Sequence, residues 1–190
     1  MIKKRVLHLV LVSIIFFSCQ TDPTSVLVSS YENSRDFVEE KNDDINKWNK
    51  LDSIFNSELY DFKYNQKNYE SHYKTKVDAV VSDYGELTKK FYKNYFLSKI
   101  EKLKSLVGSI DLSNDINLEK FSNILSDTAN QFYKLNEKIT PEDREEISKS
   151  LGVIYAKTLE TTTKAFNEDL KSNLKDFGNQ FKSTLENLFN

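Results

Sequence analysis

The sequence predicts an all-α protein, an elongated antiparallel bundle of about four helices in which the first, second and fourth are long. Apolar residues recur at spacings of three and four along most of the chain, which is the periodicity of one helix face. The 190 residues include only 4 glycines and 2 prolines, so the tight turns that a sheet protein needs are scarce. A chain of this length can bury one hydrophobic core, and we expect residues 26–190 to form a single domain.

The first helix is expected from about Val26 to Phe62. Leu51 and Ile54 widen its apolar stripe into a face that suits a bundle better than the narrow seam of a dimeric coiled coil. At a rise of about 1.5 Å per residue this helix would be more than about 50 Å long, which predicts an elongated body. The stripe itself consists of Leu27, Tyr31, Val38, Ile45, Trp48, Phe55, Leu59 and Phe62.

An acidic run from Glu39 to Asp44 falls inside this first helix. It lacks the alternating oxygen ligands and the turn glycine of a calcium-binding loop. We therefore interpret it as a solvated helix face.

A turn is expected near Asn65, where asparagines and glutamine cluster and the apolar periodicity weakens. The second helix then extends from Tyr69 to Ile110. Its stripe shifts phase between Tyr92 and Phe96, which is typical of a stutter that locally unwinds a supercoil rather than of a helix end. Gly85 costs about 1 kcal/mol relative to alanine, and we expect the helix to continue through it.

Polar residues from Ser113 to Asp115 predict the next break. A shorter third helix follows, with its stripe from Leu118 to Ile139. The clearest boundary comes next, because Thr140-Pro141 combines an N-cap residue with a proline at the first helical position. Acidic residues follow in the first turn, where the helix dipole favours them. A fourth helix is therefore expected from Pro141 to about Leu188.

The N-terminal stretch from Met1 to Cys19 has the parts of an export signal. Lys3, Lys4 and Arg5 form a cationic head, and an apolar run of about a dozen residues follows, which is shorter than the roughly 20 residues that span a bilayer. The four residues Phe16-Phe17-Ser18-Cys19 resemble the lipobox of bacterial lipoproteins. This resemblance implies cleavage between Ser18 and Cys19, removal of residues 1–18 and lipidation of Cys19. The alternative is an ordinary signal peptide or a buried apolar helix in which Cys19 has no role.

Cys19 is the one cysteine of the sequence, so the chain cannot form an internal disulfide. If Cys19 is acylated, the attached chains anchor the protein to a membrane, because two or more acyl chains hold a protein stably. Residues 19–25 then form a short lipidated tether. Gln20 stands where an aspartate retains many lipoproteins of enterobacteria in the inner membrane, so the resemblance favours the outer membrane.

The mature chain is mildly acidic. Removal of Lys3, Lys4 and Arg5 leaves 24 basic residues against 29 acidic ones, a net charge of −5. Nucleic-acid binding needs clustered lysine and arginine, which the sequence lacks, so we expect no nucleic-acid partner. The sequence also contains no polybasic membrane patch.

Most of the aromatic residues lie on the predicted apolar stripes, where large rings fill a bundle core. Tyr60, Tyr64, Tyr69 and Tyr73 are the exception, because they cluster around the predicted turn among asparagines and glutamine. Exposed tyrosine with asparagine is a common composition of binding surfaces. These four tyrosines are therefore a candidate partner-binding site, and the alternative interpretation is the plain end of a helical hairpin.

Catalysis has little support in the sequence. His72 is the one histidine of the mature chain, so no triad and no histidine-based metal site can be assembled. The sequence has no glycine-rich phosphate loop either. We expect neither an enzyme nor a cofactor nor a bound metal, and His72 is expected to be an exposed helix residue.

These observations together predict a lipid-anchored lipoprotein of a bacterial envelope that binds or scaffolds another protein. The helical character and the Lys, Asn and Phe rich composition broadly resemble the small helical envelope lipoproteins of spirochaetes and Bacteroidota, a resemblance that carries no residue roles. The alternative function is a carrier of lipid or another hydrophobic ligand, in which amphipathic helices open around acyl chains.

Overall fold

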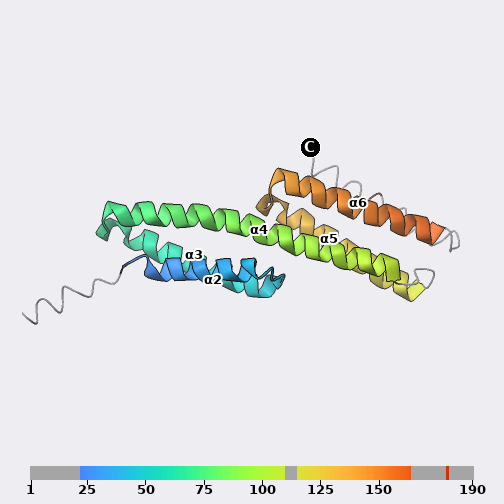
Figure 1. Cartoon of the computed structure of the whole chain (residues 1–190), viewed down its shortest axis with the longest axis horizontal. Coiled ribbons are helices and arrows are strands. Elements are labelled where there is room, and N and C mark those ends of the chain that lie inside the picture. Colours follow the sequence, from blue (N-terminus) through green and yellow to red (C-terminus); the bar gives the residue numbers. More distant parts are fainter. Residues whose placement is uncertain (1–21, 110–114, 164–178, 180–190) are drawn as a thin grey trace, which may run out of the picture. The chain divides into compact units, whose positions relative to one another are not determined.

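The computed structural model describes residues 22–109, 115–163 and 179 of the chain. These residues form α-helices and two short 3-10 turns and contain no strand, so the predicted all-α class is confirmed (Figure 1). The helices are α2 (Ser25–Glu39), α3 (Ile45–Asn65), α4 (Ser71–Ser109), α5 (Asp115–Leu135) and α6 (Pro141–Thr163), with the 3-10 turns η1 (Gln66–Asn68) and η2 (Asn136–Lys138).

The single first helix predicted from Val26 to Phe62 is wrong, because α2 ends at Glu39 and α3 begins at Ile45. The described part of the chain therefore has five α-helices where about four were predicted. Lys41 adopts the left-handed region with φ 54°, which a helix does not contain. The side-chain oxygen of Asn42 accepts the backbone N–H of Asp44 at 3.2 Å, a local bond that competes with helix formation. The acidic run from Glu39 to Asp44 is thus the connection between two helices and not a helix face.

The described chain divides into two compact units. Unit 1 comprises residues 22–37 and 46–85, and unit 2 comprises residues 38–45, 86–109 and 115–163. Helix α4 contributes to both, its residues up to Gly85 belonging to unit 1 and those from Glu86 to unit 2. The single domain expected over residues 26–190 stays a prediction.

Unit 1 is built from α2, α3 and the first part of α4, with α3 antiparallel to the other two (Figure 1). Stacked aromatic rings join the three helices. Trp48 of α3 stacks on Phe37 of α2 at 6.5 Å between ring centroids and on Tyr84 of α4 at 6.0 Å. Phe55 stacks on Tyr84 at 3.6 Å, with an angle of 3° between the ring planes. The predicted inward positions Trp48, Phe55 and Phe62 are all buried, whereas Ile54, expected to widen that face, is 51% exposed.

The inward face of α2 carries small hydroxyl side chains. Ser30 and Ser34 are buried beside Leu27 and Phe37, and the Ser34 hydroxyl donates to the Ser30 carbonyl at 2.9 Å. Tyr31, which was expected on the apolar stripe, is half-buried. The buried face of α2 is therefore rotated from the predicted one toward its small residues.

Unit 2 combines the second part of α4 with α5, α6 and the link between α2 and α3. Phe96 of α4 packs edge-to-face on Phe132 of α5 at 5.3 Å, and the Tyr95 hydroxyl donates to the side-chain oxygen of Gln131. Lys138 of η2 donates to the Tyr92 hydroxyl of α4 at 3.3 Å. The buried apolar residues of unit 2 are Val38, Leu87, Phe91, Tyr92, Tyr95, Phe96, Ile100, Leu103, Leu118, Phe121, Leu125, Ala129, Phe132, Ile139, Ile147, Leu151 and Ile154.

The apolar stripe of α4 shifts phase between Tyr92 and Phe96, in the part of the helix that belongs to unit 2. Helix α4 continues through both this stretch and Gly85, as predicted. Phe91, Tyr92, Tyr95 and Phe96 are all buried here, and since Phe91 and Tyr95, like Tyr92 and Phe96, are four residues apart, they form one wide buried face. The local unwinding of a supercoil stays a prediction.

Other predicted boundaries agree with the structure. Helix α3 ends at Asn65, where the turn was expected, and α6 begins at Pro141. The Thr140 hydroxyl accepts the backbone N–H of Asp143 at 3.2 Å, so Thr140 is the N-cap of α6. The part of the fourth helix predicted beyond Thr163 lies outside the described residues.

Candidate functional site

The predicted lipidation site, Ser18 and Cys19, lies outside the described residues, as do Phe16 and Phe17. Among the helices that the structure describes, none is both long and apolar enough to cross a membrane. The processing and acylation of the N-terminal stretch therefore stay predictions.

The first described residues are built into the start of α2. The Asp22 carboxylate accepts the Thr24 hydroxyl at 2.6 Å and the Thr24 backbone N–H at 2.8 Å, and Thr24 is buried. Lys76, in the second turn of α4, donates to the other carboxylate oxygen at 2.6 Å. The hydrogen bond from Lys76, followed by those from Thr24, lowers the pKa of Asp22 to about 2. The end of the predicted tether is thus fastened both to α2 and to α4.

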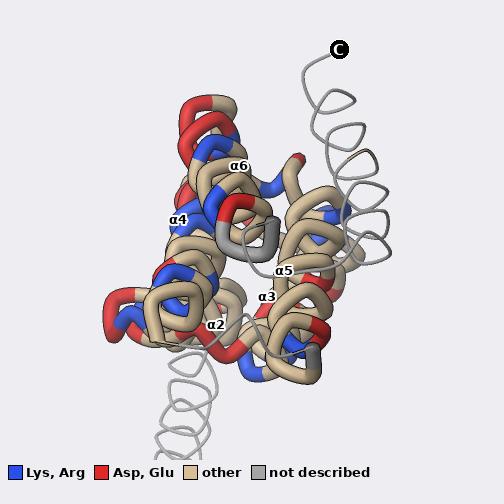
Figure 2. The backbone as a smooth tube through the Cα atoms, turned by 90° about the vertical axis from the view of Figure 1, so that its right-hand side faces the viewer, with Lys and Arg blue, Asp and Glu red and all other residues tan. Residues whose placement is uncertain are grey.

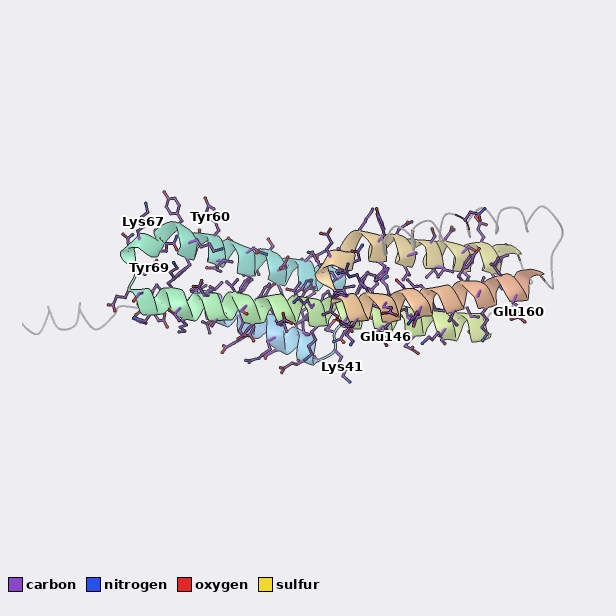
Figure 3. The ribbon with its side chains drawn as sticks, turned by 90° about the horizontal axis from the view of Figure 1, so that it is seen from above. Lys41, Tyr60, Lys67, Tyr69, Glu146 and Glu160 are labelled. Atoms are coloured by element: carbon purple, nitrogen blue, oxygen red, sulfur yellow. The ribbon has the colours of Figure 1, made fainter. Side chains whose placement is uncertain are left out.

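The four predicted tyrosines lie around the connection between α3 and α4, which we define as residues 60–74. Tyr60 and Tyr64 occupy successive turns of α3, are 68% and 78% exposed and stack on each other at 6.5 Å between ring centroids. Figure 3 shows Tyr60 projecting away from the ribbon near Lys67 at this end of α3. The exposed members of the predicted site are therefore this pair.

Tyr69 and Tyr73 are half-buried instead. The Tyr69 ring stacks on buried Phe62 at 5.1 Å, and the Tyr73 ring lies 3.8 Å from the His72 ring. They support the connection by packing, while the Tyr60–Tyr64 pair offers ring surface to the outside. Binding of a partner at these tyrosines stays a prediction.

Exposed lysines, which were not predicted as part of the site, accompany the exposed tyrosines. Lys63, Lys67 and Lys74 are exposed and form no salt bridge within the described residues. The connection carries these three lysines against Asp61 and Glu70, a local net charge of +1 in a chain whose overall net charge is −2. The interleaving of lysine with tyrosine at positions 60, 63, 64 and 67 is the signal that could have identified them.

Basic and acidic residues are interspersed on the helices of the described chain (Figure 2). In unit 2, Asp43 accepts Ser98 and Lys102, each at 2.6 Å, and Lys102, followed by Ser98, lowers the pKa of this carboxyl. Lys93 pairs with Asp143 at 2.6 Å, and this hydrogen bond raises the Lys93 pKa. These contacts hold helices and links together, since each joins two segments of the same unit.

No catalytic arrangement accompanies these contacts in the described part of the chain. His72 is exposed as predicted, and its Nδ1 atom lies 3.4 Å from a carboxylate oxygen of Glu70. Residues 22–109 and 115–163 contain no group of three or more His, Cys, Asp and Glu side chains that could hold a metal ion. Arg144 Nε and Ser148 Oγ are buried one turn apart on α6 without a hydrogen-bond partner among the described residues. The absence of an enzymatic activity and of a cofactor stays a prediction.

Comparison with known proteins assigns no family: no family model matches the chain, and no curated protein and no solved structure shows significant similarity to it.

Proposed function

We propose that the protein is a lipid-anchored lipoprotein of a bacterial envelope that acts as a non-enzymatic protein-binding or scaffolding module. The single observation that carries this proposal is the sequence Phe16-Phe17-Ser18-Cys19, in which the only cysteine of the chain follows an apolar run and a small residue. Residues 1–18 are removed, Cys19 is acylated, and the bundle is held at the outer membrane. The elongated antiparallel arrangement of the whole chain belongs to this proposal.

The fastening of Asp22 supports the anchoring role. Only Gln20 and Thr21 separate Cys19 from Asp22, whose carboxylate is fixed by Thr24 and Lys76. An acylated Cys19 would therefore hold unit 1 close to the lipid surface, because no long flexible linker separates the two. A scaffold gains from such a short link, because its exposed surfaces then keep a defined distance from the membrane.

A binding role is favoured over carriage of a hydrophobic ligand by the way the aromatic residues pack. The rings on the inward faces of unit 1 cover one another, as the stack of Phe55 on Tyr84 at 3.6 Å illustrates. A lipid carrier would have to separate such rings, at the cost of their buried contacts, to admit an acyl chain. Exposed helix faces and the Tyr60–Tyr64 pair, in contrast, are available without rearrangement.

The anchor is tested by growing cells with a fatty-acid analogue that can be labelled. The full chain is expected to incorporate the label, the Cys19→Ala variant to lose it and to remain unprocessed, and the neighbouring Gln20→Ala variant to keep it. Label on the Cys19→Ala variant would overturn the lipoprotein proposal.

The scaffolding role is tested separately by crosslinking in intact cells and identifying the captured proteins. A protein partner that is captured by the labelled, anchored chain and lost with Cys19→Ala supports a scaffold at the membrane. Co-purification of the delipidated chain with stoichiometric lipid, without a protein partner, would instead support the carrier.

A further inference from the structure

We infer that the connection between α3 and α4, with Tyr60, Tyr64, Lys63, Lys67 and Lys74, docks on the anionic lipid headgroups of the membrane that holds the anchor. This inference rests on the proposed anchoring at Cys19. It assigns to the predicted tyrosine site a lipid surface in place of a protein partner, and it fixes which end of unit 1 faces the bilayer.

The first argument is position. Three peptide links separate Cys19 from Asp22 and span at most about 11 Å. The Asp22 carboxylate lies 2.6 Å from Lys76 Nζ, and Lys76 lies five residues after Ser71, the first residue of α4. Five residues of helix rise about 7.5 Å, so the start of α4 is close to the point where the anchor enters the fold. In Figure 1 the start of α2 lies at the same end of unit 1 as the connection between α3 and α4.

The second argument is chemistry. Tyrosine is enriched at membrane interfaces, because its ring enters the apolar boundary while its hydroxyl stays among the headgroups. Tyr60 and Tyr64 are the most exposed large apolar side chains in the described part of unit 1. Lysines can extend their amines to anionic headgroups while their stems lie along the surface.

The third argument is charge. Among the residues of the connection, Lys63, Lys67 and Lys74 have no salt-bridge partner in the described chain, and together with Asp61 and Glu70 they give it a net charge of +1. Some lysines elsewhere in the described chain form salt bridges, as Lys89 does with Glu86 and Lys104 with Glu101, whereas others, such as Lys50, form none there. A locally positive, aromatic surface beside the anchor of an acidic chain complements an anionic leaflet.

A lipid surface fits this position better than a protein partner does. An acylated Cys19 within about 11 Å of Asp22 brings the bilayer to this end of unit 1. A protein that bound Tyr60 and Tyr64 would have to occupy the space between unit 1 and the headgroups.

The test uses the chain from Cys19 to Asn190, coupled through its single thiol to a maleimide phospholipid in vesicles. This chemical anchor works whether or not cells acylate Cys19. A failed fatty-acid labelling experiment would thus overturn the proposed function, while a failed docking experiment on these vesicles would overturn only the present inference.

The measurement is the rate at which an amine reagent acetylates each lysine, read by mass spectrometry. Acetylation needs the neutral amine. The negative potential of an anionic leaflet raises the local proton concentration about threefold, so a lysine amine beside the leaflet is neutral, and therefore reactive, less often. We expect Lys63, Lys67 and Lys74 to react about threefold or more slowly on vesicles that contain phosphatidylglycerol than on pure phosphatidylcholine. Lys50, which is exposed on α3 ten residues before Tyr60, should react equally on both. At 1 M salt, where the screening length falls to about 3 Å, the difference should disappear.

Variants make the assignment specific. The combined change Tyr60→Ala, Tyr64→Ala, Lys63→Gln and Lys67→Gln should remove the protection of Lys74. The matched pair Lys50→Gln and Ile54→Ala, exposed elsewhere on α3, should retain it. Helical circular dichroism of both variants verifies that they are folded. Equal acetylation of the three lysines on anionic and neutral vesicles would overturn the inference. So would protection that requires an added envelope protein and does not depend on acidic lipid.

Discussion

The rings of Phe55 and Tyr84 lie parallel and 3.6 Å apart, and this contact fastens α3 to α4 inside unit 1. Phe55 is 2% exposed, whereas Ile54, its neighbour along α3, is 51% exposed. Phe55 and Ile54 are adjacent on α3 but differ in burial. Substituting each one therefore tests which side of α3 faces the core.

Phe55→Ala should lower the free energy of unfolding by about 3–5 kcal/mol, because it removes a buried ring and leaves a cavity against Tyr84. Ile54→Ala should cost less than about 1 kcal/mol, since the side chain is half in water. Urea denaturation followed by circular dichroism measures both. Equal losses for the two variants would contradict the described orientation of α3.

Lys41→Gly should raise the free energy of unfolding by up to about 1 kcal/mol, because Lys41 adopts φ 54° and glycine reaches this region without steric cost. If residues 26–62 formed one helix, the same change would instead destabilise the protein by about 1 kcal/mol. The sign of the change thus distinguishes a connection from a helix. Glu40→Gly is the control, since Lys41 is the only described non-glycine residue with a positive φ, and it should not stabilise the protein.

Asp22→Asn should reduce thermal stability at neutral pH, by less than about 3 °C because Asp22 and Lys76 are both partly exposed. Folding lowers the Asp22 pKa from 3.8 to about 2, so the folded state favours the carboxylate. The contribution is therefore fully present above about pH 4 and is lost as the pH falls through about 2. Melting curves of the two proteins should converge toward pH 2. Asp78→Asn, a change at an exposed position of α4, is the control. It should leave the melting temperature close to that of the unchanged protein at each pH.

Thr140→Ala should cost about 1 kcal/mol of unfolding free energy, because the Thr140 hydroxyl accepts the Asp143 backbone N–H at the start of α6. Thr140→Ser keeps an accepting hydroxyl and should retain most of this stability. Chemical denaturation of both variants provides the comparison. A Thr140→Ser loss as large as that of Thr140→Ala would show that the methyl group, rather than the cap, matters.

The all-α class, the turn at Asn65 and the start of α6 could be predicted because each depends on local chemistry. Periodicity identifies a helix face, and a Thr-Pro pair specifies a helix start wherever it packs. The break after Glu39 could not be predicted in the same way. Val38 and Ile45 are seven residues apart, a spacing that continues an apolar stripe across residues that are not helical. Glutamate and lysine in the link also favour helix on their own.

The candidate site was predicted only in part for a related reason. Composition identified the tyrosines, but whether each ring faces outward depends on neighbours from another helix. Tyr69 is half-buried because it stacks on Phe62, a residue of α3, and no sequence pattern reports that contact. The lysines were missed because an unpaired charge is recognised by the absence of a partner, which requires the three-dimensional arrangement.

Helix α4 passes from unit 1 to unit 2 between Gly85 and Glu86, within a continuous helix from Ser71 to Ser109. Proteases cut exposed loops and linkers, and a helical backbone with its hydrogen bonds made resists them. The border therefore offers no site at which α4 can be nicked without local unfolding. For the same reason, a gene truncation at this border would end a helix in its middle, so the units cannot be divided here without breaking α4.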